Sequence, residues 1–129
     1  MACIQVAGQQ IELFKALLVT CPPDPNQARD MDFLLSLGEL FTLVPYGQLI
    51  LESATLKDVD DDLIDQIFEI LVSDLSRYAL DLYGARGTTK EQAERCLQMI
   101  RRPDQDPVRF DRVWSRHVIS NADAYAMND

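Results

Sequence analysis

The chain has 129 residues, a length typical of one domain with a hydrophobic core of its own. Hydrophobic residues make up 47% of it and charged residues 26%, as in ordinary globular proteins. The formal net charge of −9 argues against general nucleic-acid binding, because that activity needs a basic surface. We therefore predict a single domain, residues 1–129, that binds no nucleic acid.

Charge is unevenly distributed along this domain. Residues 1–85 contain four basic and fourteen acidic residues, a net charge of −10, whereas residues 86–129 contain eight basic and seven acidic residues, a net charge of +1. Two interpretations remain open. The C-terminal arginines pack against acidic helices of the same domain, or they form a surface for a phosphate or an acidic partner. The first is favoured, because runs of charge usually belong to the domain's own solvated helix faces.

The three cysteines, Cys3, Cys21 and Cys96, lack the spacing of metal ligands, and their odd number fits no disulfide framework. His117 is the only histidine, so a zinc site of cysteines and histidines cannot be assembled. Free thiols favour a reducing compartment, and we expect a cytoplasmic protein. Residues 1–14 carry no positive side chain, and no apolar run approaches the about 20 residues of a membrane helix. We expect neither a targeting signal nor a transmembrane segment.

Residues 9–20 are predicted to form a first helix, which the proline-rich loop up to residue 27 terminates because proline has no N–H to donate. A second helix is predicted over residues 28–53. Pro45 removes the hydrogen bond to the carbonyl of Phe41, so we expect a kink there. Gln48 is almost the only strongly polar side chain between residues 42 and 52. We expect this segment to be the most buried one. Its predicted core side consists of Phe33, Leu34, Leu37, Leu40, Phe41 and Val44.

The strongest helical pattern covers residues 61–84, where apolar residues recur on one face. Asp60 or Asp61 can cap the start of this helix, and Gly84 suits a left-handed residue at its end. A single amphipathic helix cannot bury its apolar face alone, so the pattern predicts a bundle in which neighbouring helices cover it. The residues on that face are Ile64, Ile67, Phe68, Leu71, Leu75, Tyr78, Ala79 and Leu82.

Two shorter helices are predicted in the C-terminal third. Thr88 and Glu91 fit a capping box for a helix that ends near Arg101, and Asp106 precedes Pro107 as the cap of a last helix over residues 107–119. We expect residues 121–129, which include Tyr125 and Met127, to pack along the bundle. The predicted fold class is all-α: a single bundle of four to five helices, one of them kinked at Pro45. On the last helix we place Phe110, Val113, Trp114 and Val118 inward and Arg109, Arg112 and Arg116 outward.

No catalytic motif is present, since the sequence contains no nucleophile elbow, P-loop, dinucleotide-binding fingerprint or HExxH zinc motif. His117 near a helix C-terminus fits a role in stabilising the helix dipole better than a role as a base. Glu39 and Glu52 are candidate general bases only if they are buried. We therefore predict no catalytic and no cofactor-binding residues.

A run of carboxylates imitates a calcium-binding loop. Asp58, Asp60 and Asp62 alternate along the chain, and Glu69 occupies the twelfth position counted from Asp58. The sixth position, which requires glycine for the sharp turn, is Leu63. Helix capping explains these acids better, and we predict no metal site.

Several segments resemble the C-terminal helical region of certain bacterial acyl-CoA dehydrogenases. They are Leu37–Glu52 (LGELFTLVPYGQLILE), Asp61–Phe68 (DDLIDQIF), Tyr78–Gly84 (YALDLYG), Met99–Pro103 (MIRRP) and Ala124–Asn128 (AYAMN). They follow one another in order and at plausible spacings over about residues 30–129. The likeness concerns core and turn residues and includes no catalytic signature.

The resemblance implies a known chemistry for the family. Its members oxidise acyl-CoA thioesters to enoyl-CoA: a glutamate removes an α-proton, FAD accepts a hydride, and an electron-transferring flavoprotein usually receives the electrons. Their fold is a helical N-terminal domain, a central β-domain and a C-terminal helical bundle that helps to form the tetramer and the flavin sites. The present chain has no room for the first two domains, and the family's Tyr-Glu-Gly-type segment and its flavin contacts are not found in it. It therefore resembles a terminal module alone: a separately encoded subunit, a remnant gene product or a truncated form.

Three functions remain open at this stage. We favour a non-catalytic module for the assembly or stability of an acyl-CoA dehydrogenase, with no cofactor in the isolated chain and FAD only if a partner dehydrogenase completes it. The alternatives are a subunit that contributes to FAD-dependent acyl-CoA oxidation with a partner chain, and an unrelated helical module that binds a ligand or a protein. Partners are expected to be a second copy or a dehydrogenase chain, and no membrane. The predicted interface residues are Phe14, Leu18, Tyr46 and Ile50.

Overall fold

The computed structural model describes residues 2–124, and every regular element within them is helical. The predicted all-α bundle, with Pro45 inside one of its five α-helices, is confirmed. The α-helices are α1 (Ala2–Thr20), α2 (Met31–Leu56), α3 (Asp61–Gly84), α4 (Lys90–Met99) and α5 (Pro107–Val113). Three short pieces complete the chain: η1 (Gln27–Arg29), the π-helical turn η2 (Trp114–Val118) and η3 (Ile119–Asn121).

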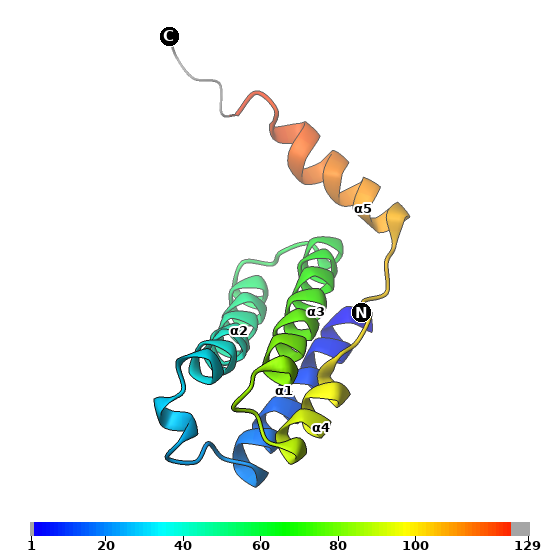
Figure 1. Cartoon of the computed structure of the whole chain (residues 1–129). Coiled ribbons are helices and arrows are strands. Elements are labelled where there is room, and N and C mark those ends of the chain that lie inside the picture. Colours follow the sequence, from blue (N-terminus) through cyan, green and yellow to red (C-terminus); the bar gives the residue numbers. More distant parts are fainter. Residues whose placement is uncertain (1, 125–129) are drawn as a thin grey trace.

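Helix α3 is the central element of the bundle, because α1, α2, α4 and α5 all pack against it (Figure 1). Its predicted limits and its buried face agree with the structure. Helices α1 and α4 also pack against each other, whereas α2 packs mainly against α3 from the opposite side. At the α2–α3 contact Gly47 is buried, and a Cβ built there would lie 3.7 Å from a methyl group of Leu71. The core thus follows α3 along its length.

Polar side chains set the starts of the helices. Asp60 accepts a hydrogen bond from the backbone N–H of Asp62, and Asp30 accepts one from Phe33 at the start of α2. The cap Asp106 followed by Pro107 is confirmed at α5. The capping box of α4 lies one residue later than predicted, on Thr89 and Gln92, because the hydroxyl of Thr88 donates instead to the carbonyl of Leu82.

Several predicted boundaries are wrong. Helix α1 begins at Ala2 rather than at residue 9, and α2 runs from Met31 to Leu56 rather than from residue 28 to residue 53. The left-handed stop at Gly84 is also wrong, since no glycine among the described residues has a positive φ and Ala85 ends α3 in an extended conformation. Asp58, with a φ of 51°, makes the left-handed turn between α2 and α3 instead.

Buried glutamines hold the long α1–α2 connection against the α3–α4 loop. The side-chain amide of Gln27 donates to the carbonyl of Gly87 at 2.7 Å, and that of Gln92 donates to the carbonyl of Cys21 at 3.1 Å. The two glutamine side chains also contact each other at 2.7 Å. Because both side chains are buried and hydrogen-bonded, they fix the course of the chain between α1 and α2.

Candidate functional site

The segment formed by α5, η2 and η3, residues 107–121, projects beyond one end of the bundle and is called the arm (Figure 1). Arg109 joins it to α3. Its guanidinium pairs with the carboxylates of Asp65 and Glu69, and its Nε donates to Oε1 of Gln66 at 3.2 Å. Only 6% of the Arg109 side chain is exposed. A buried arginine between two carboxylates is a strong, geometrically specific contact.

Three further basic side chains continue this contact toward the start of α3. Arg112 pairs with both carboxylate oxygens of Asp62 at 2.9 Å, and Arg116 lies 3.0 Å from Asp60 and from Asp62. Nε2 of His117 lies 3.2 Å from Asp60. The arm and α3 are therefore joined by a ladder of ion pairs and hydrogen bonds in which every base comes from the arm and every acid from α3 or from its N-cap, Asp60.

The ladder changes the titration of its members. The hydrogen bond from His117 and the nearby Arg116 lower the pKa of Asp60, and the hydrogen bonds and charge of Arg112 lower the pKa of Asp62. The same pairing raises the pKa of Arg112. The arm thus keeps these carboxylates ionised. Of the two interpretations of the uneven charge, the first holds for Arg109, Arg112 and Arg116, because they pack against the acidic helix of their own domain.

The predicted orientation of the last helix is wrong. Arg109 faces the bundle, whereas Phe110, Trp114 and Val118 face solvent, and of the four residues placed inward only Val113 is buried. The reason is that α3 presents Asp62, Asp65, Gln66 and Glu69 rather than an apolar face at this end, so arginines complete the contact. The three acids among them recur every three or four residues, as do the arginines, and this matched spacing was the signal that sequence reasoning missed.

The outward side of the arm carries large apolar residues without cover in the described chain. The rings of Phe110 and Trp114 stack with centroids 6.1 Å apart, and 47% of Trp114 is exposed. Val118 continues this side one turn further on. The π-helical turn at η2 is a rare conformation that occurs preferentially at functional positions. Phe110, Trp114 and Val118 are called the arm stripe below.

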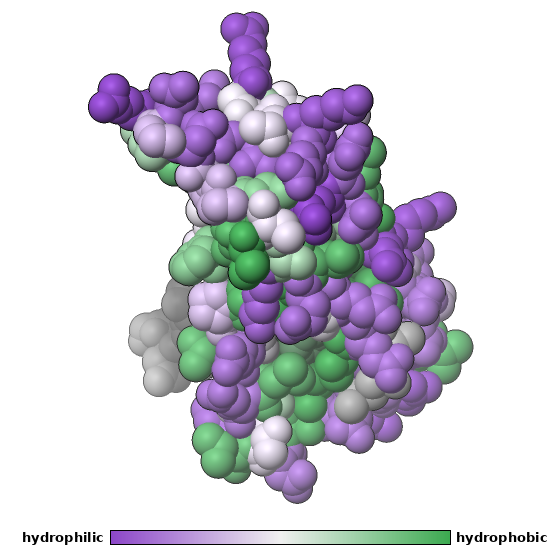
Figure 2. All heavy atoms as spheres, turned by 90° about the horizontal axis from the view of Figure 1, so that it is seen from below, coloured by the Kyte–Doolittle hydropathy of each residue, from purple (hydrophilic) through white to green (hydrophobic). Residues whose placement is uncertain are grey.

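A second uncovered surface lies on α2. The expectation that this segment is the most buried is wrong: its core contacts are limited to one side, and 61% of Phe41 is exposed. Large apolar side chains occupy the other side because apolar residues are distributed around most of the circumference of α2, with few charged residues between them. Figure 2 shows hydrophobic residues reaching the surface among hydrophilic ones on the face seen from below. The exposed large apolar residues of α2 are Met31, Leu34, Leu35, Phe41, Tyr46, Leu49, Leu51 and Leu56.

The composition of α2 also bears on the predicted absence of a transmembrane segment. By length and apolar composition alone α2 could cross a membrane, and it is the one such helix in residues 2–124. Core helices of water-soluble proteins meet the same criterion when they are mostly buried, but only 11% of the candidate span in α2 is buried, and α2 packs on α3 through one side alone. The outer side of this apolar helix has no cover among residues 2–124.

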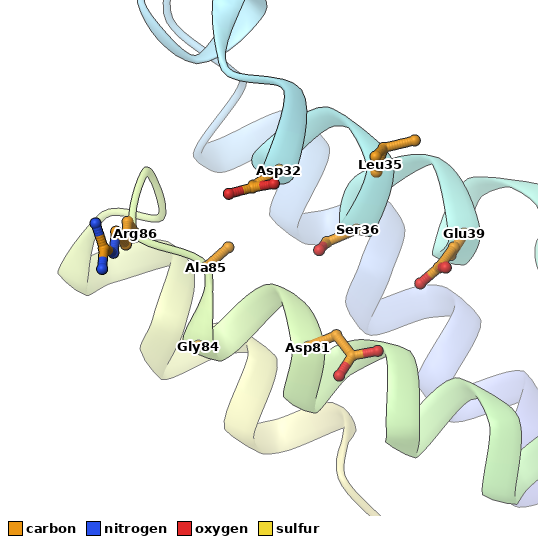
Figure 3. A pocket seen from close by; sticks show the side chains of 8 residues that line it. All are labelled: Asp32, Leu35, Ser36, Glu39, Asp81, Gly84, Ala85 and Arg86. Carbon is orange, nitrogen blue, oxygen red and sulfur yellow. The ribbon is translucent and has the colours of Figure 1, made fainter.

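A polar groove of about 500 Å³ lies between the start of α2 and the end of α3 (Figure 3). Asp32, Ser36 and Glu39 enter it from α2 and Asp81 from α3, whereas Leu35 points away from α3. None of these carboxylates takes part in an ion pair among the described residues. The groove is a negatively charged depression open to solvent.

Two apolar grooves flank α2. One, of about 430 Å³, lies between the end of α2 and the start of α3 and is bordered by Ile50, Leu63 and Ile67, with Lys57 at its rim. The other, of about 300 Å³, lies between α1 and α2 and is bordered by Phe14, Leu18 and Phe41. Both grooves open onto the exposed side of α2, so they extend its apolar surface.

The four residues predicted as an interface occupy different surroundings. Phe14 is 1% exposed and belongs to the core of the single chain, although it borders the groove between α1 and α2. Leu18 and Ile50 are half-buried and line the two apolar grooves. Tyr46 is exposed on α2. A partner surface around these four residues stays a prediction.

The candidate chemical groups are not assembled into a reactive site within residues 2–124. Glu39 and Glu52 are exposed, so neither meets the condition set for a buried base. No group of three or more histidine, cysteine, aspartate or glutamate residues could hold a metal in this part of the chain. Burial raises the pKa of the Cys96 thiol to about 11 and also raises that of Cys3, which disfavours their thiolates at neutral pH.

Fold and surface together define an all-α bundle with an ionically attached arm and two uncovered apolar surfaces. In comparisons with protein-family models, curated proteins and solved structures, nothing matched this chain. The resemblance to acyl-CoA dehydrogenases therefore stays a prediction from the sequence. The segment 121–129 was predicted to pack along the bundle; residues 122–124 form an exposed turn, and Tyr125 and Met127 lie outside the described residues.

Proposed function

We propose that the chain is a non-catalytic helical module that serves the assembly or stability of an acyl-CoA dehydrogenase. The arm stripe is the observation that carries this proposal. Its residues stand on an arm attached to the bundle by ion pairs, and a tryptophan stacked on a phenylalanine in solvent is costly unless a partner covers it. Tryptophan and arginine are also the residue types that dominate the energetics of interfaces.

The identity of the partner rests on the resemblance of residues 30–129 to the C-terminal helical region of these enzymes. In this role the arm contacts a dehydrogenase chain that lacks the region, and the bundle replaces it. The ladder between the arm and α3 supports the assignment, because it holds Phe110 and Trp114 outward in a fixed orientation before a partner arrives. Catalysis and flavin binding would remain with the dehydrogenase.

The test is co-expression of the chain with an acyl-CoA dehydrogenase that ends before its C-terminal helical region and is encoded beside it in the genome. We expect a mixed complex in size-exclusion chromatography with light scattering, and tighter flavin retention by the dehydrogenase. Trp114→Ala should abolish the complex. Leu97→Ala is the matched control, since Leu97 is exposed to a similar degree on α4. A dehydrogenase that neither binds the chain nor differs with and without it would refute the proposal.

The apolar groove at the end of α2 favours a second candidate function, the binding of a small apolar ligand. Its walls are mostly hydrophobic, as in ligand sites generally, and its about 430 Å³ is within their usual range. Titration calorimetry with dodecanoate tests this function. Binding that Ile67→Asp abolishes would support it, whereas no heat at millimolar ligand would exclude a site for aliphatic chains.

A further inference from the structure

The outer side of α2 has a regular arrangement of large and small residues. Leu35, Phe41 and Leu49 are exposed large side chains, and Gly38 and Thr42 lie on the same half of the helix between them. A Cβ built on Gly38 would meet nothing within 4 Å, so a shallow depression is open there. Such a surface can accept the large side chains of another helix in its depressions.

The charges along α2 select the direction of that second helix. An antiparallel copy of α2 that brings Leu49 opposite Gly38 also brings Lys57, the C-cap of α2, opposite Asp30, the N-cap of the other copy. In the same alignment Glu39 faces Gln48 and Glu52 faces Leu35, so no carboxylate of α2 opposes another. A parallel copy in register would instead place each carboxylate beside its own equivalent, which is destabilising. The antiparallel arrangement also opposes the two helix dipoles favourably.

The exposed area is sufficient for such a contact. The apolar side chains on the outer half of α2 expose an area of roughly 800 Å² in total. This sum takes the exposed fraction of each side chain and an area of about 150–250 Å² for a fully exposed aromatic one. A stable protein–protein interface takes about 800 Å² from each partner. The residues counted are Met31, Leu34, Leu35, Phe41, Tyr46, Leu49 and Leu56.

Charge also argues against a lipid surface as the occupant. Glu39 and Glu52 are exposed within the length of α2, and a carboxylate at membrane depth is costly. Asp30, Asp32 and Asp58 lie at its ends, and the net charge of −9 repels the anionic lipids that hold most peripheral proteins. A second copy of the chain offers Lys57 to Asp30 and places no carboxylate of α2 against another, whereas a bilayer offers these carboxylates no partner.

We propose that the outer side of α2 binds a second copy of the chain, with the two α2 helices antiparallel about a two-fold axis near Thr42 and Pro45. This contact is isologous, so both copies use the same residues and the assembly closes as a dimer. It uses a surface separate from the arm stripe and therefore does not depend on the dehydrogenase proposal.

The first test is light scattering with size-exclusion chromatography at micromolar concentration, where we expect a dimer of the 14.7 kDa chain. Phe41→Glu should raise the dissociation constant at least about tenfold, because it places two charges in the contact. Its circular dichroism should not change, since Phe41 is exposed in the single chain. Leu97→Glu, an equally drastic change at a similarly exposed site on α4, should leave the dimer intact.

The second test is cross-linking with a short bismaleimide, against wild type as the baseline because its three cysteines are buried. Thr42→Cys should cross-link, since the two copies of residue 42 lie beside the axis. Leu56→Cys should not, because an antiparallel pair separates its two copies by about 37 Å at 1.5 Å per residue. Flotation with vesicles of phosphatidylcholine and phosphatidylglycerol tests the lipid alternative, and we expect no bound protein.

Four results would overturn the proposal: a wild-type monomer throughout the concentration range, a dimer indifferent to Phe41→Glu, equal cross-linking of both cysteine variants, or flotation with the vesicles. The outcome is separable from that of the proposed function. Trp114→Ala should leave the dimer intact while it abolishes the dehydrogenase complex, and Phe41→Glu should do the reverse.

Discussion

At the scale of single residues, Arg109 carries the attachment of the arm. Two carboxylates and an amide surround its guanidinium, and hardly any of its side chain is open to water. Removing one member of such a group leaves the others buried without a partner, and that penalty exceeds the net contribution of the pair itself. Solvent-exposed pairs, such as Arg116 with Asp60, contribute much less because water screens them.

Arg109→Met should therefore lower the free energy of unfolding by about 3–5 kcal/mol, or by less if the arm detaches and lets water reach Asp65 and Glu69. Arg112→Met is the matched control, with an expected loss of no more than about 1 kcal/mol. Urea denaturation measures both. Fluorescence of Trp114, the only tryptophan in the chain, reports detachment of the arm separately. Equal losses in the two variants would show that burial of Arg109 does not matter.

The pairs at the start of α3 make the arm sensitive to acid. Asp60 and Asp62 have lowered pKa values in the folded chain, so their contribution to stability is complete above their ordinary pKa of about 3.9. It is lost as the pH falls through the lowered values. We expect the fluorescence of Trp114 to be constant down to about pH 4 and to change below it. Asp62→Asn should reduce the amplitude of that change, and a transition centred near neutral pH would contradict this account.

At the scale of elements, the limits of a helix are predicted best where a single local interaction determines them. The limits of α3 follow from its apolar period and from Asp60, and the start of α5 follows from Asp106 and Pro107. Both are local signals, readable without knowledge of the rest of the fold. The face of α5 was misjudged because its neighbour is acidic, and an apolar pattern on one helix contains no information about the helix that it meets.

The arrangement of α2 and α1 shows the same limit. Phe14 was placed at an interface and lies in the core, because α1 packs against both α3 and α4. Residues of α2 were placed in the core and face solvent, because α2 packs mainly against α3. Because apolar residues occur on most sides of α2, its sequence has no clear period that shows which side is buried. Its buried side is defined by Gly47, the position at which α3 approaches.

The α3–α4 loop offers a test of how two elements are joined. A Cβ on Gly87 would lie 2.2 Å from Oδ2 of Asp30, the residue that caps α2. Gly87→Ala should displace this carboxylate and cost about 0.5–2 kcal/mol, the usual range for a lost helix cap. Gly84→Ala is the control, since a Cβ there meets nothing within 4 Å. Thermal unfolding of the two variants measures the difference, and equal midpoints would show that Asp30 moves aside without cost.

At the scale of the whole molecule, the chain combines a well-packed core with two apolar surfaces that the described residues leave uncovered. The interior surrounds α3, where the largest fully buried side chains are those of three phenylalanines, Phe14, Phe33 and Phe68. The exterior carries the arm stripe and the outer side of α2, which lie on different elements and can be occupied at the same time. A module with two such surfaces is suited to joining other chains.

The proposed role gives a simple optical expectation. If catalysis belongs to the partner, the purified chain should be colourless, and added FAD should show no change in its absorption spectrum on mixing. Absorption spectroscopy and equilibrium dialysis with FAD measure this. A yellow preparation whose flavin remains after dialysis would assign cofactor binding to the chain itself and would favour a subunit that takes part in acyl-CoA oxidation.

The ladder that attaches the arm has a direction. Arg109 pairs with Asp65 and Glu69, and Arg116 pairs with Asp60 and Asp62, so the arm and α3 run antiparallel past each other. The arginines become more exposed along it, from 6% at Arg109 to 52% at Arg116. Water and salt therefore weaken the ion pairs of Arg116 first, and the arm detaches from α3 from its tip toward Arg109, which acts as a hinge. A partner that grips Trp114, in the middle of the arm, can tilt the outer half while the inner half stays fixed.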